Sequence, residues 1–223
     1  MKKAFVLIGA PGSGKGTQAE VLAKRFKVVH FETSKILERK LKKPKTKELK
    51  EAKKLYDTGK LVTPTIVAKV VLEEIRNLCR KGLGVVFSGS PRMLAEAKID
   101  IPILEQCFGK KNIFVFYIKL TKRESVRRNS VRKICVANRH PIPFVLKEFK
   151  NVKKCPWDGS KIVSRSLDKP KMIAKRYDVF LKDTKPVIKY FKDNKFIVRV
   201  VDGEQSIEKV HKDIIKAYEA SKR

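Results

Sequence analysis

Residues 9–17 read Gly-Ala-Pro-Gly-Ser-Gly-Lys-Gly-Thr, and this stretch decides the fold. The run before it, residues 3–8, is short, apolar and partly β-branched, which predicts a fully buried parallel strand. The run after it, residues 14–26, spaces most of its apolar side chains at helical intervals. A strand, a glycine-rich loop and a helix in this order are typical of a phosphate-binding loop. The stretch therefore predicts an α/β fold with an anion site at the end of its first strand.

The residues of this loop have the chemistry that a phosphate tail requires. Glycines let successive backbone N–H groups converge on an anion, and the helix N-terminus adds the positive end of a dipole. Lys15 supplies a point charge for the outer phosphates, and Thr17 can contact phosphate or the shell of a magnesium ion. The alternative, a glycine-rich turn with a solvated lysine, accounts less well for the position between strand and helix. The candidate residues are Gly12, Ser13, Gly14, Lys15, Gly16 and Thr17.

Length and composition indicate one cytoplasmic domain. The 223 residues fit a single α/β domain over positions 1–223. No apolar span approaches membrane length, and the apolar residues near the start lead into the phosphate loop rather than a cleavage site. Four cysteines are too few for a disulfide scaffold in a chain of this length. We therefore expect a cytoplasmic monomer without a membrane partner.

The chain is strongly basic, with 54 Lys and Arg against 23 Asp and Glu and a net charge of +31. Such a balance predicts attraction to polyanions, so nonspecific contact with RNA is one interpretation. A lysine-rich surface whose only specific anions are nucleotide phosphates is the other. Stacking aromatics are sparse in the basic runs 39–54, 122–139 and 147–154, which favours the second interpretation.

Four further apolar runs alternate with helical patterns. The runs at 28–31, 85–87, 113–119 and 196–201 predict strands, so we expect a five-stranded parallel sheet with helices on both faces. Helices are expected at 33–43, with Thr33 or Ser34 as N-cap, at 47–58, at 64–80 after Thr63, from 121 with Thr121 and Glu124 as a capping box, from 171, and from Ser206.

Two segments toward the C-terminus carry more specific predictions. Beyond Cys135 the pattern becomes Pro-rich and β-like until about residue 168, which predicts a small inserted module. The helix that starts at about Lys171 is predicted to be one long helix. Its core side would carry Tyr177, Phe180, Leu181 and Ile188.

Three arginines are candidates for binding anions. Arg92 follows the third strand, and ligands of doubly wound sheets bind at the carboxyl edge of the strands. Arg128 and Arg132 are one turn apart on the basic helix that starts near Thr121, so both could reach one anion. Positioned cations are what phosphoryl transfer asks of a protein. In so basic a chain the alternative is an ordinary charged surface.

Five motifs together resemble adenylate kinases, in order and in spacing. They are G-A-P-G-S-G-K-G-T from Gly9, T-S-K-I-L-E-R from Thr33, G-K-L-V-T-P from Gly59, S-G-S-P-R from Ser88 and V-D-G from Val201. The resemblance spans nearly the whole chain. It implies a phosphate-loop kinase core with a monophosphate-binding helical insert at residues 32–62 and a LID at residues 127–168. The implied reaction moves the terminal phosphoryl group of MgATP, with Mg²⁺ as cofactor, to AMP and gives two ADP.

The resemblance also implies roles for individual residues. Lys15 and the loop amides would hold the ATP phosphates, Arg92 the acceptor phosphate, and Arg132, Arg165 and Arg176 the transferring group. Arg128 would cover the ATP adenine. The ATP-binding set is Gly12, Ser13, Gly14, Lys15, Gly16, Thr17, Arg128 and Arg132. The monophosphate-binding set is Thr33, Arg39, Lys60, Val62, Gly89, Arg92, Glu96, Arg165 and Arg176.

The chain departs from the family pattern where the acceptor binds. Glu38 stands where an arginine usually grips the AMP phosphate, and Arg39 lies one residue, or about 100° of helix, further on. Lys35 and Ser88 replace two aspartates that steady magnesium-bound water. Glu96 replaces a glutamine that reads adenine, and a carboxylate accepts hydrogen bonds only, which suits guanine better. The alternatives are therefore a kinase for another monophosphate, or a catalytically weak nucleotide-dependent RNA-binding or regulatory protein.

The expected LID contains a candidate metal site, Cys135-x2-Asn138-x16-Cys155-x2-Asp158. This spacing is similar to that of the zinc-bearing LIDs of some adenylate kinases, which implies a structural Zn²⁺. Thiolates and a carboxylate suit tetrahedral zinc, whereas a neutral amide is a poor ligand, and His140 could replace Asn138. The alternative is a metal-free cluster in which Asn138 and Asp158 bond to each other and both thiols stay reduced.

Overall fold

The core of the computed structural model is a parallel sheet. The structure describes residues 2–57, 62–138, 140–142, 144, 149–164 and 168–221, and only the backbone of Pro64. Within them, five strands pair in the order β2-β3-β1-β4-β8. Every neighbouring pair is parallel. The strands are β1 (Ala4–Gly9), β2 (Val29–Phe31), β3 (Val85–Phe87), β4 (Ile113–Lys119) and β8 (Val198–Asp202). The predicted fold class is confirmed.

Strand β1 is the middle strand of the sheet, and all six of its residues are buried. Alternate side chains of a strand point to opposite faces of the sheet, and both faces of β1 are apolar. On one face Val6 and Ile8 belong to a core that includes Ile75, Leu104 and Phe191. On the other face Phe5 and Leu7 pack with Leu22, Ile214 and Tyr218. The strand therefore ends in a position fixed from both sides.

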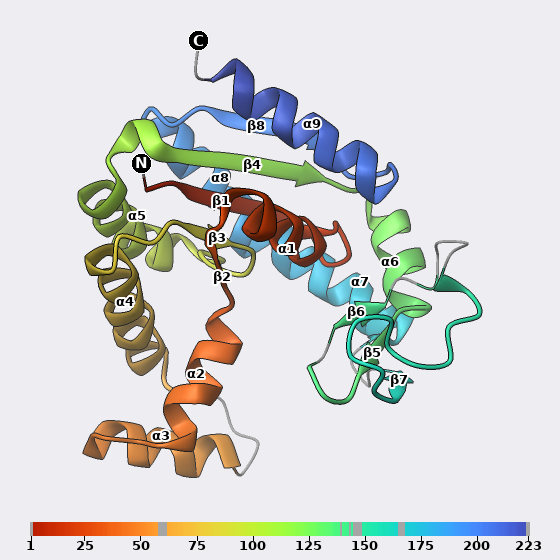
Figure 1. Cartoon of the computed structure of the whole chain (residues 1–223), viewed down its shortest axis with the longest axis horizontal. Coiled ribbons are helices and arrows are strands. Elements are labelled where there is room, and N and C mark those ends of the chain that lie inside the picture. The colour runs from red at the N-terminus through yellow and green to blue at the C-terminus, as the bar shows by residue number, and fades with distance from the viewer. Residues whose placement is uncertain are drawn as a thin grey trace.

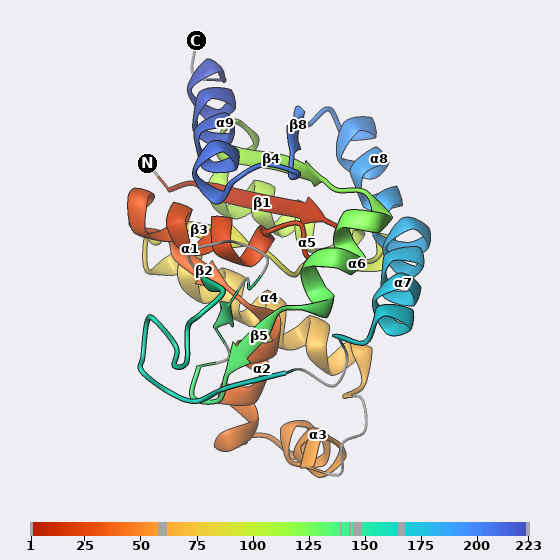
Figure 2. The same cartoon turned by 90° about the vertical axis from the view of Figure 1, so that its right-hand side faces the viewer.

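Helices cover both faces of this sheet. The helices α4 (Pro64–Arg80), α5 (Leu94–Phe108) and α8 (Lys185–Asp193) supply the first core, and α1 (Lys15–Phe26) and α9 (Ile207–Ala220) the second. In Figure 2, α9 lies to the left of the strands and α8 to their right. A short 3₁₀ turn, Lys110–Asn112, joins α5 to β4. None of the helices that the structure describes is both long and apolar enough to cross a lipid bilayer.

Two smaller parts extend from the core. Helices α2 (Thr33–Lys42) and α3 (Lys47–Asp57) lie below the sheet in Figure 1. To their right, beyond α6 (Lys122–Ser130), is a second sheet in the order β6-β5-β7. Its antiparallel strands are β5 (Lys133–Cys135), β6 (Pro141–Ile142) and β7 (Ile162–Ser164). The described residues after Cys135 thus contain strands, in the segment for which a β-like pattern was predicted.

The helix predicted from residue 171 is interrupted. Helix α7 (Pro170–Val179) passes through a π-helical segment, Phe180–Thr184, before α8 begins. A π-helical turn inserts an extra residue and changes which side chains face the core. Phe180 and Ile188 are buried as expected, but Leu181 is 40% exposed. The prediction that Leu181 lies on the core side is therefore wrong.

Other element boundaries also differ from the predictions. Helix α6 ends at Ser130, so Arg132 lies beyond the helix that was expected to carry it. The N-cap of α2 is Glu32, and Thr33 is already the first helical residue. The last strand begins at Val198 rather than at residue 196. Phe196 is nevertheless buried in the core, which explains its apolar character.

Of the two hydrogen bonds of the capping box expected at Thr121, the described residues form one. The Thr121 hydroxyl accepts a hydrogen bond from the Glu124 backbone N–H at 3.3 Å. The Glu124 carboxylate does not return to the Thr121 backbone, because it accepts hydrogen bonds from Arg127 and Arg128 instead. The Thr121 N–H donates to the Glu204 carboxylate, 2.9 Å away. A distant side chain thus completes the start of α6.

Candidate functional site

The loop between β1 and α1 has the backbone of a phosphate-binding loop. Gly12 and Gly14 have φ of 78° and 88°, a region that L-residues with a side chain rarely adopt. The Ser13 N–H donates to the Ala10 carbonyl at 3.1 Å, which folds the loop back on itself. Gly14 is the N-cap of α1. The predicted strand, loop and helix are all present, and the loop wraps the positive end of α1.

Lys15 lies at the centre of a converging set of cations. Its Nζ donates to the carbonyl oxygens of Gly9 and Ala10 at 2.7 and 2.9 Å. Burial, and to a smaller extent the positive charges of Arg92, Arg176 and Arg132, lower the pKa of Lys15 to about 7. The three guanidinium groups therefore act on one ammonium group from different parts of the chain. An anion bound among them would relieve this repulsion.

Asp168 fixes two of these guanidinium groups. Arg132 donates to it through Nε at 3.0 Å and through Nη2 at 2.8 and 2.6 Å. Arg176 donates to it through Nη1 at 3.3 Å. The Asp168 side chain is only 4% exposed, so this ion pair is shielded from water. Asp168 was not predicted from the sequence, because an isolated aspartate near the end of a loop has no local signal.

The cations face a cavity of about 1010 Å³ at the carboxyl edge of the parallel sheet. Its polar end is formed by the phosphate loop and the arginines. Its other end is apolar and lies between α2, α4 and α5, where Leu37, Val67, Val71, Met93 and Ile99 line it. The predicted site residues that line the cavity are Gly12, Gly14, Lys15, Gly16, Thr17, Thr33, Val62, Gly89, Arg92, Glu96, Arg128, Arg132 and Arg176.

Other candidates lie elsewhere. The Arg39 Nη2 donates to Glu74 Oε1 at 2.7 Å, and Arg39 is not among the residues that line the cavity. Ser13 is buried within the loop rather than on the cavity wall. Arg128 lines the cavity while its Nε donates to Glu124 at 2.6 Å. Lys60 and Arg165 fall outside the described residues.

The substituted family positions form a hydrogen-bonded group at the edge of the cavity. The Ser88 hydroxyl lies 2.7 Å from His30 Nε2, and Lys35 forms an ion pair with Glu32. Glu32 and Ser88 line the cavity together with Thr17. The absence of both aspartates was evident from the sequence, whereas the position of Glu32 at this cavity was not. A carboxylate is therefore present near the phosphate loop, at a different position in the chain.

Glu96 and Thr33 also face the cavity. The Glu96 Oε2 accepts a hydrogen bond from the Arg92 backbone N–H at 2.7 Å, which joins the start of α5 to the Ser-Pro-Arg turn. The Thr33 hydroxyl oxygen is buried and has no hydrogen-bond partner among the described residues. Glu38 lies on the outer side, 3.9 Å from Lys42, and does not line the cavity.

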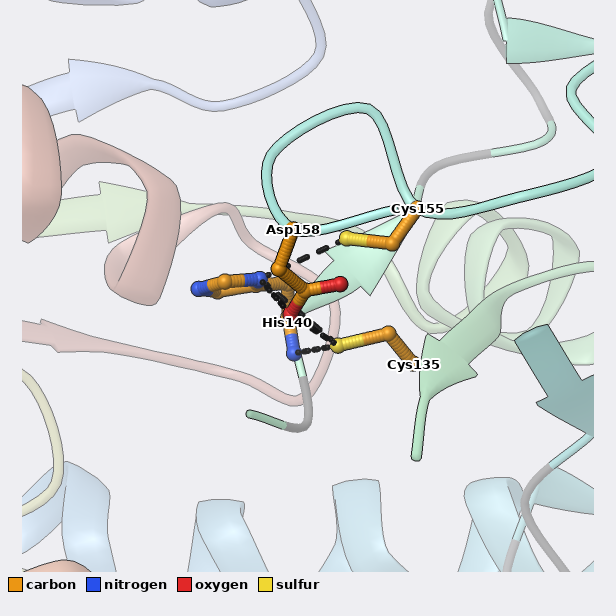
Figure 3. Close-up of side chains that lie close together, drawn as sticks. All are labelled: Cys135, His140, Cys155 and Asp158. Carbon is orange, nitrogen blue, oxygen red and sulfur yellow. Dashed lines mark hydrogen bonds and ion pairs between the residues drawn. The ribbon is translucent and has the colours of Figure 1, made fainter. Parts of the chain in front are cut away.

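Four ligand-type side chains meet in the small sheet. Atoms of Cys135, His140, Cys155 and Asp158 lie within 4.8 Å of one another (Figure 3). His140, not Asn138, contributes the fourth of these atoms, while the Asn138 amide donates to Asp158 Oδ2 at 2.9 Å. Hydrogen bonds from Ser160 and Asn138 hold the pKa of Asp158 well below its usual range.

Comparison with known proteins covers most of the chain. A model of the adenylate kinase family matches residues 7–196. The adenylate kinase of Petrotoga mobilis is 33% identical over 210 residues, which are 94% of this chain and 94% of that protein. The adenylate kinase of Methanocella arvoryzae is 34% identical over 211 residues, which are 94% of this chain and 95% of that protein. The adenylate kinase of Caldicellulosiruptor bescii is 33% identical over 214 residues, which are 96% of this chain and 97% of that protein.

These matches and the geometry of the cavity agree. The family match includes the phosphate loop, the Ser-Pro-Arg turn, and the arginines that converge on Lys15. The expected resemblance is confirmed over nearly the whole length. The chain belongs to the adenylate kinase family.

Proposed function

We propose that this chain transfers the terminal phosphoryl group of MgATP to AMP, giving two ADP, with Lys15, Arg92, Arg132 and Arg176 as the positioned cations. The single observation that carries this proposal is the convergence of three guanidinium groups on the buried Lys15 ammonium, beside the phosphate loop. Phosphoryl transfer requires little covalent chemistry from a protein. It requires in-line placement of two phosphates and neutralisation of the charge between them.

Each cation has a separate task in this proposal. Lys15 leaves the carbonyls of Gly9 and Ala10 and contacts the outer phosphates of ATP, while the loop N–H groups hold the rest. Arg92 binds the phosphate of the acceptor. Arg132 and Arg176 act on the transferring group, and Asp168 keeps both guanidinium groups in a fixed orientation. Arg128 covers the ATP base.

We assign residues 32–62 to the acceptor-binding insert and residues 127–168 to the LID. Both lie at the edges of the cavity, so their closure over bound nucleotides would exclude water from the reacting groups. Arg165 and Lys60 belong to these inserts and keep the roles that the family resemblance implies. We also propose that the protein works as a cytoplasmic monomer, which light scattering would test through its molar mass.

The cavity also contains oxygen donors suited to magnesium. Mg²⁺ bound with ATP neutralises phosphate oxygens, and it usually keeps several waters that carboxylates orient. The Thr17 hydroxyl and the Glu32 carboxylate line the cavity, so these two side chains would face the ion and its waters. Glu32→Gln should raise the Mg²⁺ concentration required for half-maximal rate, and should weaken binding of Mn²⁺ to the nucleotide complex measured by electron paramagnetic resonance.

We further propose a structural Zn²⁺ held by Cys135, His140, Cys155 and Asp158. Ligands in a tetrahedron with bonds of about 2.0–2.3 Å are about 3.3–3.8 Å apart. The His140 Nδ1 lies 3.6 Å from the Cys135 sulfur and 3.4 Å from the Cys155 sulfur. The Asp158 Oδ2 lies 3.2 Å from the Cys135 sulfur and 3.1 Å from His140 Nδ1. The two spacings of the His140 nitrogen from the sulfurs lie in this range, the two spacings of the Asp158 oxygen are slightly shorter, and two thiols with an imidazole and a carboxylate are ligands that suit zinc.

Metal analysis of purified protein tests this site. After dialysis against a weak chelator we expect about one Zn²⁺ per chain in the parent protein and in Asn138→Ala, but a near-zero content in His140→Ala. Asn138→Ala is the matched control because its amide contacts Asp158 without being one of the four ligand-type groups. Equal zinc content in both variants, or none in the parent, would refute the assignment.

The kinase proposal is tested at Lys15. Lys15→Met should lower the rate of ADP formation from ATP and AMP on the order of 10²-fold or more, because it removes a cation from a buried phosphate site. Lys24→Met is the control, since Lys24 is an exposed residue of the same helix. An unchanged rate in Lys15→Met, or no ADP formation by the parent protein, would contradict the proposal.

A binding protein that has lost turnover is the competing proposal from a different class. The net charge of +31, Lys35 and Ser88 support it. Salt-sensitive retention on RNA, in a protein that forms no ADP from ATP and any monophosphate, is the outcome expected for this alternative.

A further inference from the structure

Two acidic side chains line the apolar end of the cavity and have no part in the transfer of the phosphoryl group. Glu96 and Asp100 are one turn apart on α5, and both face the cavity beside Ser90. Asp100 is only 4% exposed. Burial of a carboxyl group costs free energy unless the group forms hydrogen bonds. A ligand in the cavity could supply such a hydrogen bond. These three residues form what we call the acidic wall.

The hydrogen bonds within the acidic wall leave only acceptors free. The Ser90 hydroxyl donates its hydrogen to Asp100 Oδ2 at 3.1 Å, so its oxygen can only accept a further bond. The Glu96 Oε2 already accepts the Arg92 backbone N–H at 2.7 Å. The second oxygens of Glu96 and Asp100 form no hydrogen bond within the described part of the chain, so they can accept from a ligand.

The Asp100 carboxyl group is mostly ionised at pH 7. Burial, and to a smaller extent the charge of Glu96, raise the pKa of Asp100 to about 6, while the Ser90 hydrogen bond opposes this shift. The charge of Glu96, which contributes to this shift, lies one helical turn from Asp100 on α5. Like charges at this spacing destabilise a helix, and a ligand that donates two hydrogen bonds would compensate for the repulsion.

The nucleobases differ in how well they match such a wall. The edge of adenine offers N6–H₂ as donor but N1 as acceptor, so N1 would face a carboxylate that cannot donate to it. The edge of guanine offers N1–H and N2–H₂, which are adjacent donors. The apolar side chains of Leu37, Val67, Val71, Met93 and Ile99 line the same end of the cavity, where the flat faces of a purine can pack.

We propose that the acceptor pocket binds guanine as well as adenine, with Glu96 and Asp100 accepting from N1–H and N2–H₂, so that GMP is a second phosphoryl acceptor. The proposal rests on the assignment of this end of the cavity to the acceptor in the proposed function. In the reaction the bond between the terminal phosphorus of ATP and its bridging oxygen breaks. A bond from that phosphorus to a phosphate oxygen of GMP forms, giving ADP and GDP.

The test compares four monophosphates at a fixed MgATP concentration in the parent protein, Glu96→Gln, Asp100→Asn and the control Glu105→Gln. Glu105 lies on the same helix, outside the cavity, beside Lys110. We expect the parent protein to use GMP with a kcat/KM within about tenfold of that for AMP, and CMP and UMP less well. Glu96→Gln and Asp100→Asn should each lower the GMP-to-AMP ratio about tenfold, because the amide presents a donor to guanine N–H groups.

A binding measurement separates this inference from the proposed function. The shift in the midpoint of thermal unfolding with saturating GMP or AMP reports binding without turnover. GMP should stabilise the parent protein and the Glu105→Gln control equally, and should stabilise Glu96→Gln and Asp100→Asn less. Stabilisation by GMP without turnover of any monophosphate would support guanine binding in this pocket, but it would overturn the kinase proposal and with it the role of GMP as a phosphoryl acceptor.

Two results would overturn the inference. One is turnover of AMP with GMP below about 1% of the AMP value, together with no thermal stabilisation by GMP. The other is a GMP-to-AMP ratio that is the same in the parent protein, Glu96→Gln and Asp100→Asn. In either case AMP phosphorylation would remain, and the acidic wall would be a structural feature of α5.

Discussion

Lys15 shows how a single side chain depends on its surroundings. In the free protein its ammonium group donates to the Gly9 and Ala10 carbonyls, and its pKa is lowered to about 7, mainly by burial. Three arginines add to this shift. A bound triphosphate would supply negative charge at the same place and return the pKa to a value at which the group is charged. Binding of ATP is therefore coupled to a proton.

Binding of ATP should take up about one proton at pH 8, because Lys15 is mostly neutral in the free protein and charged in the complex. Calorimetric titration in two buffers of different ionisation enthalpy measures this uptake. The uptake should fall close to zero in Lys15→Met and stay unchanged in Lys24→Met. Equal uptake in all three proteins would show that another group takes the proton.

The same shift has a consequence for the stability of the free protein. The unfolded chain holds a proton at Lys15 up to pH about 10.5, whereas the folded protein releases it above pH about 7. Between these values the unfolded state binds more protons, so this group makes the free energy of unfolding rise with pH. The destabilisation is complete below pH 7 and is relieved as the pH rises toward 10.5.

At the scale of elements, the N-termini of the helices differ in the hydrogen bonds that stabilise them. The Thr121 hydroxyl accepts the Glu124 N–H at the start of α6, and α6 leads directly to Arg132 and β5. Thr63 occupies the same N-cap position at α4 but makes no side-chain capping bond. Two threonines that look equivalent in the sequence therefore differ in the structure, and this difference can be measured.

Thr121→Ala should lower the free energy of unfolding by about 1 kcal/mol, whereas Thr63→Ala should lower it by clearly less. The physical reason is that only Thr121 satisfies a backbone N–H at the end of its helix. Urea unfolding monitored by circular dichroism gives both values. Equal losses in the two variants would contradict the importance of the Thr121 hydrogen bond.

At the scale of the whole molecule, the net charge of +31 acts on folding and on binding in opposite ways. Like charges across the surface repel one another in the compact state, and salt screens this repulsion. Nucleotide phosphates are attracted by the same charges and by the cations of the cavity, and salt weakens this attraction. Added salt should therefore raise the stability of the free protein and lower its affinity for nucleotides, so the two effects of the net charge have opposite signs.

Raising the ionic strength from about 0.01 M to about 0.15 M shortens the screening length from about 30 Å to about 8 Å. The free protein should become more stable over this range, because 54 basic side chains outnumber 23 acidic ones. The affinity for ATP should decrease over the same range. Thermal unfolding and calorimetry measure the two effects, and a fall in the unfolding temperature would show that attractive ion pairs dominate.

Local patterns in the sequence determined the sheet, the phosphate loop and the family. A buried strand, two glycines with positive φ and a following helix are short-range features, so β1, the loop and α1 were predictable from consecutive residues. The lysine and arginine motifs are also local. The relation between Arg92, Arg132 and Arg176 could only be expected from the family resemblance.

Only the tertiary structure decided which distant side chains share a site. Asp168 holds Arg132 across 36 residues, and the small sheet places His140 rather than Asn138 among the ligand-type atoms. Arg39 pairs with Glu74 on another helix, and the π-helical segment moves Leu181 out of the core. Asp100 lines the cavity from α5, one turn after Glu96. Long-range contacts depend on how helices and strands pack, and no periodicity or motif within a short stretch records that packing.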